Sequence, residues 1–237
     1  MDRPRLLVLV RHGESQRNVA KKGNTYFIDD ESRRSVRGVA DHKVPLTGTG
    51  ARQAEATGRA LRERFGAFDY AYHSGYRRTV ETSEGILRAF SEEERAAIQV
   101  RHSLFIRERD SGHAYDMTTA EAEAAFPWLR AYWETTGSLF AHPPGGESLA
   151  QVCERVYLFL NMLFRDRAGQ RILVVTHGGT LRAFRFLLER WTYEEAEVRF
   201  RSETPTNCSV TSYEYDEAAR RLVLRDLNAV YHDHPTE

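Results

Sequence analysis

The stretch from residue 6 to residue 15, Leu-Leu-Val-Leu-Val-Arg-His-Gly-Glu-Ser, decides how the rest of the chain is interpreted. Its first five residues form an uninterrupted apolar run, which is typical of a strand buried on both faces of a parallel sheet. The run then changes abruptly to Arg-His-Gly-Glu at residues 11–14. A second such run, 171–176, ends in the same way at His177. The two runs predict central strands whose ends carry polar, reactive side chains.

Strand patterns alternate with helical patterns along most of the chain, which predicts an α/β fold: a doubly wound, mostly parallel sheet with helices on both faces. The last two strand patterns alternate between apolar and polar residues and predict an antiparallel pair. Helices are predicted at 47–65, 76–90, 148–165 and from 180 onward, and further strands at 68–73, 98–105, 208–215 and 222–227.

The length of 237 residues suits one large α/β domain. No linker rich in Gly, Pro or Ser separates two halves, and we find no internal repeat. We therefore predict a single domain, 1–237, with excursions at about 20–44 and 110–147. The first excursion is polar and mixed in charge, which indicates a long surface segment. The second is rich in aromatic residues and is interpreted as an inserted lid region.

Composition excludes several classes of protein. Hydrophobic residues make up 41% and charged residues 29%, which allows a packed core. The 34 basic and 34 acidic residues balance to a net charge of 0, which argues against nucleic-acid or membrane partners. The basic residues include only three lysines, so a few of the many arginines are candidates for bidentate anion contacts, the rest reflecting lineage preference. No membrane span or signal peptide is evident, which favours a cytoplasmic protein.

Three predicted strands end in polar residues: Arg11 and His12, then Ser74, then His177. In open α/β sheets the ligand crevice lies at the carboxyl ends of the strands, and helix N-termini there favour anions. Two histidines distant in sequence are thus expected to meet at one anion-binding edge. Taken singly, each of these histidines could equally be a surface or hydrogen-bonded structural residue.

The motif at residues 9–15, Leu-Val-Arg-His-Gly-Glu-Ser, with Asn18, resembles the signature of the histidine phosphatase superfamily, the phosphoglycerate-mutase-like proteins. The resemblance covers nearly the whole chain in the right order. It implies the phosphoglycerate-mutase-like fold and phosphoryl transfer through a phosphohistidine. Later segments that resemble the superfamily are 45–47, 74–79, 107–109, 145–148, 176–179 and 207–210.

The resemblance implies a role for each matching residue. His12 would attack phosphorus as a neutral imidazole, its pKa lowered by flanking guanidinium groups. Glu108 would protonate the leaving alcohol and then activate water, and His177 would donate to a phosphoryl oxygen. No metal ion or cofactor is needed, and no cluster has metal-ligand spacing in the sequence. The implied phosphate contacts are Arg11, Asn18, Arg78 and Gly178, with Arg109 as a further candidate.

Alternatives stay open at several of these positions. Arg77 adjoins Arg78 and only one of the two can enter the site, while Glu108 and Arg109 lie in a charged run that could be solvated surface. The acid segment also departs from that of the glycolytic mutases, which favours a phosphatase acting on a small phosphorylated metabolite. There are two alternatives. One is a phosphoglycerate mutase, which is an isomerase, and the other is a non-catalytic module that binds phosphorylated ligands. A homodimer is compatible with the sequence.

Overall fold

A six-stranded mixed sheet forms the centre of the protein in the computed structural model, which describes residues 3–232. The strand order is β3-β2-β4-β1-β5-β6. The first four strands in this order run parallel, and the two at the other edge pair antiparallel. The strands are β1 (Leu6–Arg11), β2 (Tyr70–His73), β3 (Gln99–His102), β4 (Arg171–Thr176), β5 (Val210–Asp216) and β6 (Arg221–Ala229).

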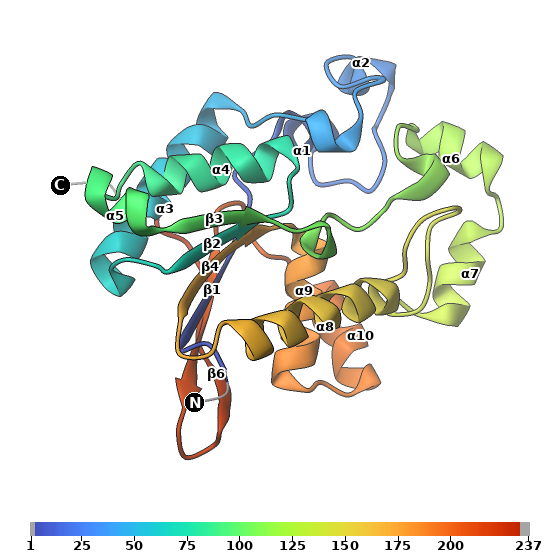
Figure 1. Cartoon of the computed structure of the whole chain (residues 1–237). Coiled ribbons are helices and arrows are strands. Elements are labelled where there is room, and N and C mark those ends of the chain that lie inside the picture. The colour runs from blue at the N-terminus through green and yellow to red at the C-terminus, as the bar shows by residue number, and fades with distance from the viewer. Residues whose placement is uncertain (1–2, 233–237) are drawn as a thin grey trace.

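Helices cover both faces of this sheet (Figure 1), as central strands that are apolar on both faces require. Leu7 and Leu9 of β1 point into one core, and Leu6, Val8 and Val10 point into the other. The predicted doubly wound α/β fold is therefore confirmed. The first core lies under α8 (Leu149–Asp166) and α9 (Gly178–Glu189), and α10 (Tyr193–Ser202) packs beside α9. The second core lies under α3 (Gly48–Phe65) and α4 (Arg77–Leu87), and the short helix α5 (Glu92–Ala97) that follows has no buried residue.

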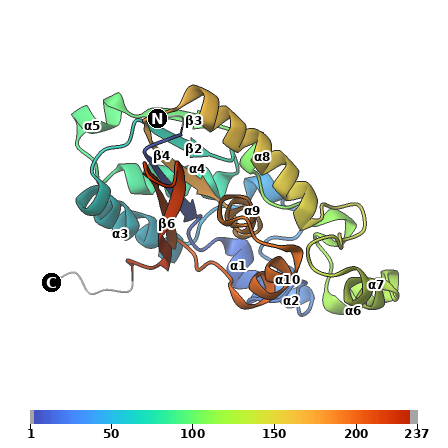
Figure 2. The same ribbon diagram turned by 90° about the horizontal axis from the view of Figure 1, so that it is seen from below.

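The two predicted excursions lie at the same end of the molecule and contact each other (Figures 1 and 2). Phe27 forms a bridge with Thr118, and Arg33 makes a bidentate pair with Glu121 at 2.6 and 2.8 Å. Helix α1 (Gln16–Lys21) leads into the first excursion, which holds α2 (Asp30–Arg33) and the short 3-10 helix η1 (Asp41–Lys43). The second excursion holds η3 (Gly112–Ala114), α6 (Thr119–Ala125) and α7 (Leu129–Thr136).

Two local details differ from the sequence-based expectations. The strand predicted over 98–105 is shorter, because the Ser103 hydroxyl accepts a hydrogen bond from the Phe105 N–H and starts the 3-10 helix η2 (Leu104–Ile106). The first excursion is also less superficial than expected, since Phe27 and Val36 are fully buried in a small core of its own. Across residues 3–232, no helix is both long enough and apolar enough to cross a bilayer.

Candidate active site

His12 lies directly beyond the end of the central strand β1 and is 2% exposed. Its Nδ1 lies 2.7 Å from the carbonyl oxygen of Gly13. Because a carbonyl oxygen only accepts, Nδ1 must carry the proton and the lone pair is on Nε2. Burial, and then the charges of Arg78 and Arg11, hold the pKa of His12 well below its usual range. His12 is therefore a neutral imidazole with a fixed tautomer.

His177, at the start of α9 beyond β4, is held by a chain of hydroxyl groups. Its Nε2 lies 2.8 Å from Ser74 Oγ, which lies 2.8 Å from Thr79 Oγ1. The Thr79 hydroxyl donates to the carbonyl of Tyr76, so each hydroxyl is oriented and His177 donates through Nε2. The His177 Nδ1 atom is buried without a hydrogen-bond partner and faces the site. The rings of His12 and His177 lie 5.3 Å apart.

Arg11 and Arg78 lie near both histidines and act electrostatically on them. Nη1 of Arg11 donates to the carbonyl of Pro205 at 2.5 Å, while its buried Nε has no hydrogen-bond partner. Arg78, near the start of α4, is 4% exposed, and the neighbouring Arg77 instead pairs with Glu81 on the surface. Of the two adjacent arginines, Arg78 is thus the one that enters the site.

The Glu108 carboxylate completes the cluster. Its Oε2 lies 3.5 Å from Nδ1 of His177 and 3.9 Å from Nη2 of Arg78, and its Oε1 accepts from the Arg109 N–H. Burial raises the pKa of Glu108, with the Asp41 carboxylate adding to the rise and the arginines opposing it. A raised pKa favours the protonated form that a general acid requires.

The segment that carries Glu108 is fixed by residues that sequence reasoning did not identify. Arg155 of α8 donates to the carbonyl of Glu108 at 3.2 Å and pairs with Glu147 at 3.0 Å. Hydroxyl groups of Thr176 and Thr180 each donate, at 2.7 Å, to carbonyls of this segment. These contacts join residues far apart in sequence, so no local signal could have revealed them.

Three other predicted contacts lie at the rim of the cluster. The oxygen of Asn18 is used in the cap of α1 and by Asn207, so its amide N–H groups are what it can offer a phosphoryl oxygen. Gly178 is the first residue of α9 and lies beside the Arg11 guanidinium. Arg109 donates to the carbonyls of Glu147 and Ala141 and lies over an aromatic ring, so its guanidinium is largely engaged by the protein.

The cluster has the residue types of a metal site as well as those of an anion site. Ligand atoms of His12, Glu108 and His177 lie within 4.8 Å of one another. The spacing in the sequence could not show this set, because three distant segments contribute it. The charges of Arg11 and Arg78 act on the same cluster and oppose a dication, so the charges fit a bound anion better.

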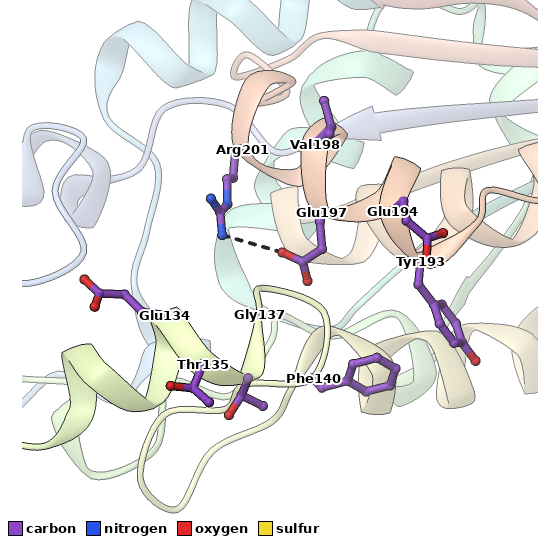
Figure 3. Close-up of a pocket in the computed structure, with 10 residues that line it drawn as sticks. Glu134, Thr135, Gly137, Phe140, Tyr193, Glu194, Glu197, Val198 and Arg201 are labelled. Carbon is purple, nitrogen blue, oxygen red and sulfur yellow. Dashed lines mark ion pairs between the residues drawn. The ribbon is translucent and has the colours of Figure 1, made fainter.

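A depression of about 460 Å³ lies on the surface between α7 and α10, away from the histidine cluster (Figure 3). Glu134, Glu194 and Glu197 line it, and one of them pairs with Arg201. Glu197 also accepts hydrogen bonds from two backbone N–H groups of the 137–139 turn, which is a structural role. Its excess of carboxylates makes this groove unsuited to a phosphate.

Comparisons with known proteins agree with this arrangement. The profile of the histidine phosphatase superfamily (branch 1) matches residues 7–228. The chain is 33% identical to the phosphoglycerate mutase-like protein AT74 of Arabidopsis thaliana over 82% of its length, but spans only 60% of that relative. It is 32% identical to a 2,3-bisphosphoglycerate-dependent phosphoglycerate mutase of Methylocella silvestris, covering 79% of this chain and 83% of the relative.

A solved structure shows the same fold. The alpha-ribazole phosphatase of Shigella flexneri superposes with a TM-score of 0.71 at 22% sequence identity, covering 94% of this chain and 96% of the other. The superfamily profile spans nearly the whole chain, including every segment that forms the cluster described above. The chain therefore belongs to the histidine phosphatase superfamily.

Proposed function

We propose that this protein is a metal-independent phosphatase that hydrolyses a small phosphomonoester through a phosphohistidine at His12. The observation that carries the proposal is the meeting of a neutral, tautomer-fixed imidazole with Glu108, His177 and two arginines at the carboxyl edge of the sheet. Superfamily membership supports phosphoryl transfer, in either of its forms.

In the first step, Nε2 of His12 attacks phosphorus in line with the leaving oxygen, forming a P–N bond and breaking the P–O ester bond. Protonated Glu108 gives its proton to the departing alkoxide, which leaves as an alcohol. Arg11 and Arg78 neutralise the charge on the phosphoryl oxygens. Burial and the charge of Arg78 lower the pKa of His177 in the free protein. Its Nδ1 would therefore take up the proton of a bound phosphate monoanion and share it with a phosphoryl oxygen.

In the second step, the Glu108 carboxylate takes a proton from a water molecule, whose oxygen attacks phosphorus and breaks the P–N bond. Inorganic phosphate leaves, and His12 and protonated Glu108 are restored. Over the two steps, Glu108 thus acts first as an acid and then as a base.

Contacts around the acid segment favour hydrolysis over the mutase reaction. A mutase must hold the carboxylate of its substrate while the phosphoryl group moves. The arginines flanking Glu108 are occupied: Arg107 pairs with Glu147 at 2.5 Å, and Arg109 donates to two backbone carbonyls. The identity to curated mutases favours the second candidate, a phosphoglycerate mutase. Assay of 3- to 2-phosphoglycerate conversion, with and without a bisphosphate primer, separates the two.

The proposal predicts that His12→Asn abolishes phosphate release from an aryl phosphate, whereas the matched variant His102→Asn, at an exposed position of β3, retains it. Removing a nucleophile typically costs several orders of magnitude in rate. Brief reaction with labelled substrate should leave an acid-labile, base-stable phosphate on wild type and none on His12→Asn. Undiminished release by His12→Asn would exclude the mechanism, and a wild type without turnover or labelling would favour the non-catalytic binding module.

A further inference from the structure

The Asp41 carboxylate, delivered by the first excursion, occupies the inferred phosphate clamp Arg78. Nη1 of Arg78 donates to Oδ1 of Asp41 at 3.0 Å and to its backbone carbonyl at 2.7 Å. Nη2 donates to Oδ2 at 3.2 Å. The pair is bidentate, and the Asp41 side chain is 25% exposed while that of Arg78 is 4% exposed. An acidic side chain therefore occupies both Nη atoms of an arginine that we expect to bind an anion.

Carboxylate and phosphoryl oxygens bind a guanidinium with the same forked geometry. A phosphoryl group reaching the Nη atoms of Arg78 therefore competes with Asp41 for the same donors. It is also repelled by the carboxylate at short range. Asp41 must move, or its contact with Arg78 must weaken, when the phosphate binds.

A second cation lies within electrostatic reach of Asp41. Arg17 of α1 is 8% exposed and packs against the rings of Tyr115 and Phe27, with centroid distances of 3.5 and 5.0 Å. Its Nη2 donates to the carbonyl of Tyr115, but its Nη1 is buried without a hydrogen-bond partner. Burial lowers the pKa of Arg17, and the Asp41 carboxylate opposes this effect. Arg17 thus offers a spare donor to a carboxylate that leaves Arg78.

The chain before Asp41 is anchored, which restricts the movement. The N–H of Gly38 donates to Oδ2 of Asp116 at 3.1 Å, and the hydroxyl of Tyr115 donates to the carbonyl of Val39 at 3.0 Å. Residues 38–39 are thereby fixed to the second excursion. The change of partner then involves the Asp41 side chain and the short turn that carries it.

We propose that Asp41 controls the affinity of the site for phosphate by exchanging partners: it pairs with Arg78 in the free protein and with Arg17 when phosphate is bound. The inference rests on the proposed role of Arg78 as a phosphate ligand. Because Asp41 competes for Arg78, inorganic phosphate, the product, should bind weakly. When the phosphate dissociates, Asp41 pairs with Arg78 again.

The first test is calorimetric titration with inorganic phosphate and with vanadate, neither of which requires turnover. Asp41→Asn and Asp41→Ser should each bind both anions about tenfold more tightly than wild type, since the competing charge-assisted contact is gone. Glu31→Gln is the matched control, because it removes the same charge from the same excursion at an exposed pair with Arg34. Unchanged or weaker binding by both Asp41 variants, with the folded state confirmed by thermal unfolding, overturns the proposal.

The second test asks whether Arg17 is the alternative partner. Arg17→Gln should weaken phosphate binding several-fold in the wild-type background and leave it unchanged in the Asp41→Asn background, because the two residues act through one contact. An equal loss in both backgrounds means that Arg17 acts independently of Asp41 and overturns the exchange. If the proposed hydrolysis is wrong, the His12→Asn assay of phosphate release shows it. The binding measurements do not depend on that assay, because they require no turnover.

Discussion

At the scale of single residues, the site shifts the pKa values of His12 and Glu108 so that both neutral forms are favoured. Burial and the neighbouring guanidinium groups lower the pKa of His12, which keeps the imidazole neutral. Burial raises the pKa of Glu108, which favours the neutral acid. The reactive form of the free protein has His12 unprotonated and Glu108 protonated, so both directions of shift widen the pH range in which that form exists.

These directions predict a bell-shaped pH profile of kcat/KM. The acidic limb, where His12 gains a proton, should lie well below pH 6.5, and the alkaline limb, where Glu108 loses its proton, should lie above pH 4.5. With an aryl phosphate of low leaving-group pKa, Glu108→Gln should keep most of kcat/KM and lose the alkaline limb. With an alkyl phosphate it should lose about 10²–10⁴-fold.

Initial rates for both substrates between pH 4 and pH 9, as measured for wild type and Glu108→Gln, check this prediction. Equal losses of kcat/KM on the two substrates would show that Glu108 does not protonate the leaving group.

At the scale of elements, helix α3 packs directly on the loop that carries His12. A methyl group at Gly50, in its first turn, would lie 2.1 Å from the carbonyl oxygen of Glu14. Further along the same helix, a methyl group at Gly58 would lie 2.4 Å from the carbonyl oxygen of Ile86 in α4. Both contacts require glycine, but only the first touches the catalytic loop.

We therefore expect Gly50→Ala and Gly58→Ala to destabilise the protein by similar amounts, about 1–3 kcal/mol each, with different effects on activity. Gly50→Ala should lower kcat of the folded protein because it displaces the His12 loop. Gly58→Ala should lower kcat less, because its contact is with Ile86, at the end of α4 opposite to Arg78. Chemical denaturation together with kcat per folded molecule measures both effects. Equal loss of kcat in the two variants would contradict the prediction.

The elements also show what the sequence could predict. β1 and β4 were predictable because each is an apolar run long enough to be a buried strand. The start of the helix predicted from residue 47 was predictable because its cap, Thr47, is a local signal. The burial of Phe27 was not predictable, since a lone aromatic residue in a polar segment has no periodicity.

Some residues of the site could be predicted from the sequence and others could not. The strand ends indicated where His12 and His177 would lie, and the resemblance added Glu108 and Arg78. Asp41 could not be predicted, because its contact with Arg78 depends on how the first excursion folds back across 37 residues. Arg155 was missed for the same reason, since its partners lie on another element.

At the scale of the whole molecule, the net charge of zero conceals a local cluster of charged side chains. The 34 basic and 34 acidic residues cancel, yet Arg11, Arg17 and Arg78 gather at one edge of the sheet, with Asp41 and Glu108 among them. Many other arginines pair with nearby acids, such as Arg130 with Glu134 and Arg225 with Glu214 on the surface. The field is therefore short-ranged and suits a small phosphorylated ligand better than a polyanion.

This distribution predicts no measurable binding of duplex DNA at physiological ionic strength, because neutralising several phosphates needs a continuous basic surface. Fluorescence anisotropy of a labelled duplex, titrated with protein at low and at physiological salt, tests it. Tight binding with a steep dependence on salt concentration would contradict it and reopen a nucleic-acid role.

The position of β1 in the sheet has a consequence for biosynthesis. This strand is made first, but its two neighbours, β4 and β5, follow only at residues 171–176 and 210–216. At about 5–20 residues per second, the ribosome needs roughly 10–40 s to supply both. Until then the nucleophile strand has no hydrogen-bonded neighbour on either side. A nascent or prematurely terminated chain is thus catalytically silent, and the apolar run beside His12 is a segment that chaperones would have to shield.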